Sequence, residues 1–246
     1  MVDKRIIEQV LAEQYEELVE LQNVELCTRK EEAEIDIDSN LAQVVIGVRR
    51  SGKSTLCYNV LKAHKDKFAY VNFDDERFQN MQTSDLNTVL EVLYKVYGDF
   101  KYLFLDEIQN IPHWEHFARR LANEQYRVYL TGSNAKMLSS EVATTLGGRY
   151  MIQEVYPYSL SEYLKANELE LQKNWEYDSA IVNHIHRLFS NYFYYGGFPE
   201  SVHVREKRSW LSVLYQKIFL GDDFGYTKCL DKIYKKRQGA RLFKLC

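Results

Sequence analysis

The 246-residue sequence is poor in cysteine and proline, with four cysteines and three prolines. Because Cys27, Cys57, Cys229 and Cys246 are widely spaced, no Cys-x-x-Cys pair supports a zinc ribbon or a redox motif. Reduced thiols are therefore expected. The sequence also lacks a run of about 18 apolar residues, so we expect no membrane span. The acidic, amphipathic N-terminus is unlike a signal peptide, and the expected compartment is the cytoplasm.

A strong excess of charge is also lacking. The 32 basic and 35 acidic residues give a net charge of −3. This balance gives no electrostatic argument for a nucleic-acid partner, although a local basic face stays open. The basic residues do gather in one place, residues 226–246, which are too few to form a domain of their own.

Short apolar runs alternate with segments of helical spacing over the first two thirds of the chain. The expected strands are residues 42–46, 68–73, 102–105, 127–131 and 149–155, and the helices between them are 53–64, 84–97 and 114–123. This alternation predicts an α/β fold in which a mainly parallel five-stranded sheet carries helices on both faces.

The change of pattern along the chain predicts four regions. We expect an N-terminal helix and loop over residues 1–40 and the sheet-containing core over residues 41–156. Only helical spacing follows, which predicts a helical lid or subdomain over residues 157–221. Residues 222–246 form a basic, atypical tail, which we expect to be mobile or loosely docked because it has few apolar residues to bury.

The segment from Gly47 to Thr55 matches the phosphate-binding pattern G-x-x-x-x-G-K-[ST], known as Walker A. Glycines let the backbone wrap around phosphates, Lys53 supplies a cation to the β- and γ-phosphates, and Ser54 offers a hydroxyl to Mg²⁺. An ordinary glycine-rich turn is disfavoured because the motif follows a predicted strand and opens a predicted helix. The expected nucleotide-binding residues are Gly47, Arg50, Ser51, Gly52, Lys53, Ser54 and Thr55.

Two adjacent carboxylates follow the third predicted strand, as in a Walker B motif. Ligands bind at the carboxyl ends of the strands in open α/β sheets. There Asp106 is suited to hold Mg²⁺, and Glu107 to polarise an attacking water. The alternative is a solvated start of a loop.

Two further residues are candidates for catalysis. Asn134 follows the fourth predicted strand and is suited to bind the γ-phosphate or the attacking water. Ser133 is the alternative for that role, and a turn or helix cap without a catalytic function is the alternative for both residues. Arg149 follows two glycines. It could be an arginine finger that acts on a neighbouring subunit, a sensor within its own chain, or a salt-bridged residue at the start of a strand. The first of these roles would require a homo-oligomer, which also stays open.

Together these residues resemble the prokaryotic AAA-type ATPases that carry a C-terminal domain of unknown function. The resemblance covers roughly residues 1–221 and rests on the phosphate-binding loop and on segments 70–75, 105–109, 130–135, 148–149, 156–160 and 196–200. It implies ATP binding and hydrolysis at Lys53, Ser54, Asp106 and Glu107. It also implies that Asn134 is a sensor and that Arg149 belongs to the active site.

The sequence departs from that family after about Gly221, where family members continue into a second domain. The resemblance therefore suggests a C-terminally truncated member, and it leaves the output of hydrolysis undefined. Three functions stay open: an ATPase coupled to a conformational change, a nucleotide-dependent switch with little turnover, and a small-molecule kinase. Glu107 beside Asp106 favours hydrolysis over transfer, because it gives water a base.

Overall fold

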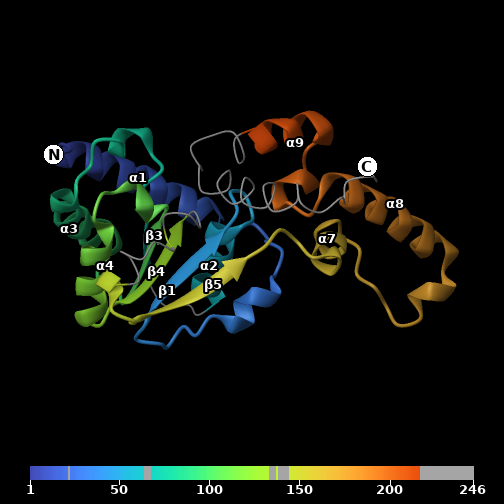
Figure 1. The fold of residues 1–246 in the computed structure, drawn as a ribbon, viewed down its shortest axis with the longest axis horizontal. Helices are drawn as coiled ribbons and strands as arrows, with labels where there is room; N and C mark the ends of the chain where they lie inside the picture. Colours follow the sequence, from blue (N-terminus) through green and yellow to red (C-terminus); the bar gives the residue numbers. More distant parts are fainter. Residues whose placement is uncertain (22, 64–67, 133–136, 138–143, 217–246) are drawn as a thin grey trace, which may run out of the picture.

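A computed structural model describes residues 1–21, 23–63, 68–132, 137 and 144–216, and a parallel sheet forms the centre of this part of the chain (Figure 1). Its strands are β1 (Ala42–Gly47), β2 (Phe68–Asn72), β3 (Tyr102–Asp106), β4 (Arg127–Gly132) and β5 (Tyr150–Val155). They are ordered β2-β3-β4-β1-β5, and every neighbouring pair is parallel. The predicted α/β fold with a five-stranded parallel sheet is confirmed.

Helices cover both faces of the sheet. The helices of the core are α1 (Lys4–Leu21), α2 (Lys53–Ala63), α3 (Leu86–Tyr97) and α4 (Trp114–Asn123). Side chains of β1 alternate between two apolar clusters: Val44 and Ile46 pack with α1, α3 and α4, whereas Val45 packs with α2. Such two-sided burial explains why the inner strands β1, β3 and β4 are mainly apolar in sequence.

Short 3-10 helices connect several of these elements. They are η1 (Lys30–Glu34), η2 (Glu76–Phe78), η3 (Thr83–Asp85), η4 (Ile108–Asn110), η5 (Trp175–Tyr177) and η6 (Pro199–Val202). Among the described residues, no helix has an apolar stretch long enough to cross a bilayer.

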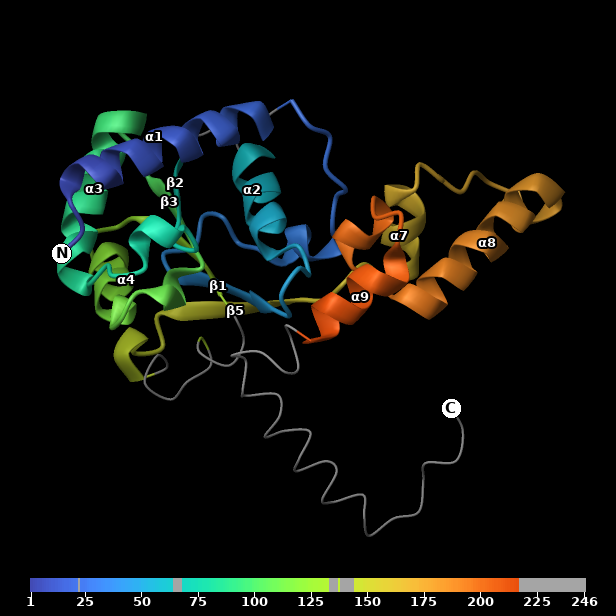
Figure 2. The same cartoon turned by 90° about the horizontal axis from the view of Figure 1, so that it is seen from above.

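In the described part of the chain, three helices follow β5 and lie beyond its carboxyl end (Figure 2). They are α7 (Leu160–Ala166), α8 (Ser179–Tyr195) and α9 (Lys207–Tyr215), and we call residues 157–216 the helical subdomain. Its small core contains Tyr163, Leu164 and Leu188. The basic tail predicted at 222–246 lies outside the described residues.

A close backbone contact joins the start of the helical subdomain to the segment that follows α8. The N–H of Tyr158 donates to the carbonyl of Gly197 at 2.7 Å, and the hydroxyl of Tyr192 donates to the carbonyl of Tyr158 at 3.0 Å. A Cβ at position 197 would lie 2.2 Å from the carbonyl oxygen of Tyr158, so the contact requires glycine. The segments around Tyr158 and Gly197, far apart in sequence, therefore meet at one place.

Candidate nucleotide-binding site

The phosphate-binding loop leads from β1 into α2, at the carboxyl edge of the sheet. The N–H of Ser51 donates to the carbonyl of Val48 at 3.1 Å, and the N–H of Leu56 donates to the carbonyl of Gly52 at 2.9 Å. Gly52 has a φ of 95°, in the region that favours glycine. The loop therefore makes a tight turn that runs directly into the first turn of the helix.

The Lys53 side chain folds back onto this loop. Its ammonium donates to the carbonyls of Gly47 at 3.2 Å and Val48 at 3.3 Å, and the residue is 5% exposed. The charge lies next to the N-terminus of α2, whose free N–H groups and dipole also favour an anion. The loop thus concentrates positive potential where the sequence predicts phosphates.

Asp106 at the end of β3 meets Ser54 of α2. The Ser54 hydroxyl donates to Oδ1 of Asp106 at 2.9 Å, and the Tyr70 hydroxyl donates to Oδ2 at 3.3 Å. The hydroxyl of Thr131, from β4, also donates to Oδ1. Three neighbouring elements therefore converge on one carboxylate that is only 3% exposed.

Burial raises the pKa of Asp106 from its ordinary value, while the hydrogen bonds from Thr131 and Ser54 oppose that rise. A buried carboxylate beside a serine hydroxyl is a pair of oxygen donors suited to Mg²⁺, which usually takes one or two protein ligands and completes its shell with phosphates and water. The residues present therefore fit a magnesium–nucleotide complex.

Glu107 follows directly and has a left-handed backbone, with a φ of 51°. Its N–H donates to the Thr131 hydroxyl at 3.1 Å, and its carboxylate accepts a hydrogen bond from the Gln109 amide. Positive φ at a residue with a side chain is uncommon and often marks a functional site. The bend in the backbone directs the adjacent carboxylates of Asp106 and Glu107 to different partners.

The remaining predicted residues are not brought together at this site. Arg50 has a φ of 66°, and its guanidinium pairs with Glu200 of η6. Arg149 is exposed, contacts Asn123, and precedes β5 at the amino edge of the sheet. At about 3.3 Å per residue, β5 puts about 17 Å of strand between Arg149 and the loop edge, so direct contact within one chain is not supported. Asn134 and Ser133 lie outside the described residues.

Three polar residues of the site were not singled out from the sequence, although each lies in a segment that carries the family resemblance. Thr131 and Tyr70 lie on predicted strands, and Gln109 lies in a short helix after β3. The position of Thr131 at the end of a strand was the available signal for that residue. For Tyr70 and Gln109 the available signal was their place in segments 70–75 and 105–109, and the structure adds their contacts with Asp106 and Glu107.

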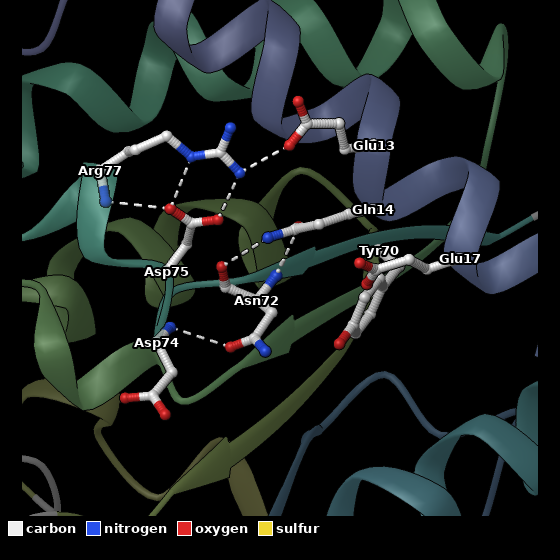
Figure 3. A pocket seen from close by; sticks show the side chains of 8 residues that line it. All are labelled: Glu13, Gln14, Glu17, Tyr70, Asn72, Asp74, Asp75 and Arg77. Carbon is white, nitrogen blue, oxygen red and sulfur yellow. Dashed lines mark hydrogen bonds and ion pairs between the residues drawn. The ribbon is translucent and has the colours of Figure 1, made fainter.

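A cavity of about 190 Å³, separate from the phosphate-binding loop, lies at the edge of the sheet between α1 and the carboxyl end of β2 (Figure 3). The Gln14 side-chain amide donates a hydrogen bond to the carbonyl of Asn72 and accepts one from its N–H, each at 3.0 Å. These bonds satisfy the backbone groups of Asn72 on the edge strand β2. Arg77 pairs with Asp75 at 2.8 Å and Glu13 at 2.7 Å. The charged lining is thus largely paired within itself.

A loop of this kind runs from a strand inside a parallel sheet into the next helix. Together with an acidic residue at the end of β3, which is separated from β1 by one strand, it defines the P-loop NTPase fold. A family model described as an AAA domain matches residues 39–164, more than half of the chain. The chain therefore belongs to the AAA domain family.

Two relatives are uncharacterized prokaryotic proteins. One, from Methanocaldococcus jannaschii, is 34% identical over 205 residues, covering 81% of this chain and 44% of the relative. The other, from Haemophilus influenzae, is 33% identical over 199 residues, covering 75% of this chain and 46% of the relative. The chain thus spans less than half the length of the curated relatives it matches.

Solved structures are more distantly similar. The Walker-type ATPase of Pyrococcus abyssi has a TM-score of 0.44 and 14% identity, covering 87% of this chain and 77% of that one. AMPPCP-bound DnaA from Aquifex aeolicus has a TM-score of 0.39 and 17% identity, covering 95% and 70%.

Proposed function

We propose that this protein binds Mg-ATP at the loop from Gly47 to Thr55 and hydrolyses it, as an AAA-type ATPase coupled to a conformational change. The observation that carries the proposal is the 2.9 Å hydrogen bond between Ser54 and Asp106. It joins Ser54, at the end of the phosphate-binding loop, to Asp106, at the end of β3. A hydroxyl and a carboxylate placed in this way are the two groups that a magnesium–nucleotide complex requires.

Each residue has a separate role in this proposal. Lys53 and the loop amides bind the phosphates, and Ser54 and Asp106 hold Mg²⁺, which neutralises charge developing on the phosphate oxygens. Glu107 orients the attacking water and accepts its proton. A catalytic role for Arg149 is proposed only toward the nucleotide of a neighbouring copy, because its own loop lies at the opposite edge of the sheet.

A switch with little turnover is the second candidate. The Glu107 carboxylate already accepts a hydrogen bond from Gln109, and a base held in this way is less available to water. In this alternative the protein binds the nucleotide and changes conformation, but it hydrolyses slowly until the Gln109 contact is released.

A coupled phosphate-release assay separates these functions, run with and without DNA and candidate phosphate acceptors. Glu107→Gln keeps the size of the side chain and removes the base, so we expect retained Mg-ATP binding and turnover lowered by about 100-fold or more. Glu124→Gln, which alters an exposed carboxylate just after α4 that pairs with Arg120, is the matched control and should keep wild-type turnover. Equal turnover in Glu107→Gln and wild type would place the base elsewhere. Binding without turnover in wild type would favour the switch.

A further inference from the structure

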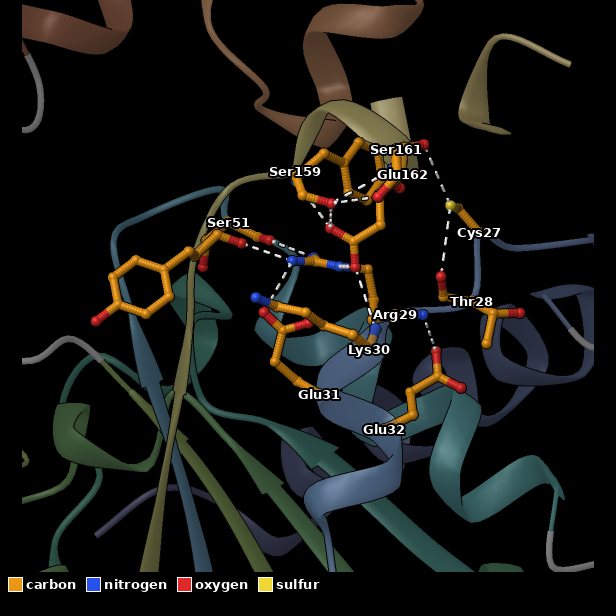
Figure 4. A network of polar contacts seen from close by, with 12 residues as sticks. Cys27, Thr28, Arg29, Lys30, Glu31, Glu32, Ser51, Ser159, Ser161 and Glu162 are labelled. Atoms are coloured by element: carbon orange, nitrogen blue, oxygen red, sulfur yellow. Dashed lines mark hydrogen bonds and ion pairs between the residues drawn. The ribbon is translucent and has the colours of Figure 1, made fainter. Parts of the chain in front are cut away.

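Arg29 is a buried cation outside the predicted site, in the segment before η1. Its side chain is 3% exposed, and its guanidinium donates in three directions (Figure 4). Nε donates to the Glu162 carboxylate at 3.1 Å, Nη1 to the carbonyl of Ser51 at 3.0 Å, and Nη2 to the carbonyl of Tyr156 at 2.7 Å.

These three acceptors belong to three separate parts of the molecule. Ser51 is in the phosphate-binding loop, Tyr156 follows the end of β5, and Glu162 is in the first turn of α7. The guanidinium is planar and its donors have fixed relative directions, so it holds its acceptors in a defined geometry. Arg29 therefore ties the phosphate-binding loop to the helical subdomain.

Charge neutralisation alone does not account for this arrangement. Burial raises the pKa of Glu162, but hydrogen bonds from Ser159, from the N–H of Lys30 and the charge of Arg29 outweigh it and hold that pKa below its ordinary value. Glu162 is thus an ionised partner, and a carboxylate oxygen of Glu31 lies 3.6 Å from Nη2 of the guanidinium. The hydrogen bond to the Ser51 carbonyl is additional to these ion pairs.

The hydrogen bond to Ser51 has a direct consequence for phosphate binding. In a trans peptide the C=O and the N–H that follows it point in opposite directions. Because Arg29 holds the carbonyl of Ser51, the N–H of Gly52 in the same peptide must point away from Arg29. Backbone N–H groups of this loop are the donors that bind phosphates.

The helical subdomain also touches the same turn directly. A Cβ at Gly52 would lie 3.3 Å from Nη1 of Arg29 and 3.4 Å from Cγ of Pro199, in η6. Arg50, two residues before Gly52, pairs with Glu200, also in η6. The turn that carries the phosphate-binding amides is therefore packed against both Arg29 and the helical subdomain.

We propose that Arg29 is a positioning residue that orients the Ser51–Gly52 peptide and anchors α7 with one guanidinium, so that nucleotide binding and docking of the helical subdomain stabilise each other. The proposal rests on the proposed function, because nucleotide binding is one of the two events it couples. Arg29 itself need not touch the nucleotide.

Arg29→Lys tests the coupling. Lysine keeps the charge, but its compact ammonium group on a flexible side chain lacks the planar, fixed donors of a guanidinium. It therefore cannot hold Ser51, Tyr156 and Glu162 together. Mg-ATP affinity is measured by calorimetry, and amide hydrogen exchange of residues 160–166 is measured with and without Mg-ATP. We expect affinity to fall about tenfold, as for loss of one charged hydrogen bond. We also expect Mg-ATP to slow exchange in α7 of wild type but not of the variant.

Two further variants make the result specific. Glu162→Gln alters α7 at a residue whose carboxylate accepts hydrogen bonds from Arg29, Lys30 and Ser159, none of which is in the loop, and it should also weaken Mg-ATP binding. Arg120→Lys, at an exposed pair with Glu124 on α4, is the matched control and should change affinity less than about twofold. Melting temperatures establish that each variant is folded.

The outcomes separate this proposal from the proposed function. A folded Arg29→Lys that keeps wild-type affinity and a wild-type response of α7 overturns the coupling, as does a lowered melting temperature with unchanged affinity. If wild type does not bind Mg-ATP, the proposed function fails. Amide hydrogen exchange measured without nucleotide then tests whether Arg29 links the loop to α7. Faster amide exchange than in wild type, in both α7 and residues 51–53 of Arg29→Lys, supports this link. Unchanged exchange at residues 51–53 overturns it.

Discussion

Replacing Gly47 with alanine tests how closely the end of β1 approaches β5. A Cβ at position 47 would lie 2.2 Å from the carbonyl oxygen of Val155 and 2.7 Å from the Ser51 hydroxyl. The nearer atom is backbone, in a residue that is the register partner of Gly47. It cannot rotate away as a side chain would. Since non-bonded heavy atoms are best separated by about 3.5 Å, the end of β5 must shift by about 1 Å.

That shift determines the size of the effect. Overpacking of this kind costs about 1–3 kcal/mol in free energy of unfolding. For a chain of this size each kcal/mol lowers the melting temperature by about 2–4 °C, so we expect a fall of about 2–12 °C. Mg-ATP affinity should fall as well, because Ser51 lies in the loop and Tyr156, one of the residues held by Arg29, directly follows β5.

Thermal unfolding followed by circular dichroism, together with calorimetry of Mg-ATP, measures both effects. Gly98→Ala is the matched control: its φ is 72°, and a Cβ there would meet no atom within 4 Å. It should show only the backbone cost of a side chain in this sparsely populated conformation, about 1–3 kcal/mol, and normal Mg-ATP affinity. Wild-type melting and affinity in Gly47→Ala would refute the claim that this glycine is required by close approach.

The remaining predictions concern catalysis, pH and assembly. A Cβ at Gly132 would lie 2.2 Å from Oε1 of Gln109, so Gly132→Ala should alter turnover in the phosphate-release assay more than Mg-ATP affinity; the reverse would contradict the proposed role of Gln109. Burial raises the pKa of the Cys57 thiol well above its ordinary value of 9.0 and that of Tyr158 to about 12. Both groups release protons more readily when unfolded, so stability in urea should be full at neutral pH and fall above about pH 9; a flat profile to pH 11 would show otherwise. Arg149→Ala should leave Mg-ATP affinity unchanged in dilute protein, and weaker binding there would favour action within the chain.

Much of the fold was predictable because its signals are local. Buried parallel strands are short and apolar, and the P-loop has a fixed spacing, so residues 42–55 defined a strand, a loop and a helix start without tertiary information. Asp106 and Glu107 were recognisable for a similar reason: each follows an apolar strand at the edge where parallel sheets bind ligands.

The rest depends on contacts between distant segments. Arg29 stands in an irregular, charged stretch, where nothing local distinguishes it from a solvated arginine, and the three acceptors of its guanidinium hydrogen bonds are 22 to 133 residues away. Arg149 shows the opposite problem. Its two preceding glycines suggested a functional loop, but the parallel register puts it beside Ala42, at the start of β1 rather than at the P-loop end.

Direct measurement of Mg-ATP binding tests the central claim, namely that the loop from Gly47 to Thr55 holds the nucleotide. The account predicts that calorimetry detects saturable, magnesium-dependent binding to wild type and to Lys62→Ala, a control at the last turn of the same helix. It predicts no measurable binding to a folded Lys53→Ala, because that change removes the cation held against the loop. Equal affinity of Lys53→Ala and wild type would contradict it.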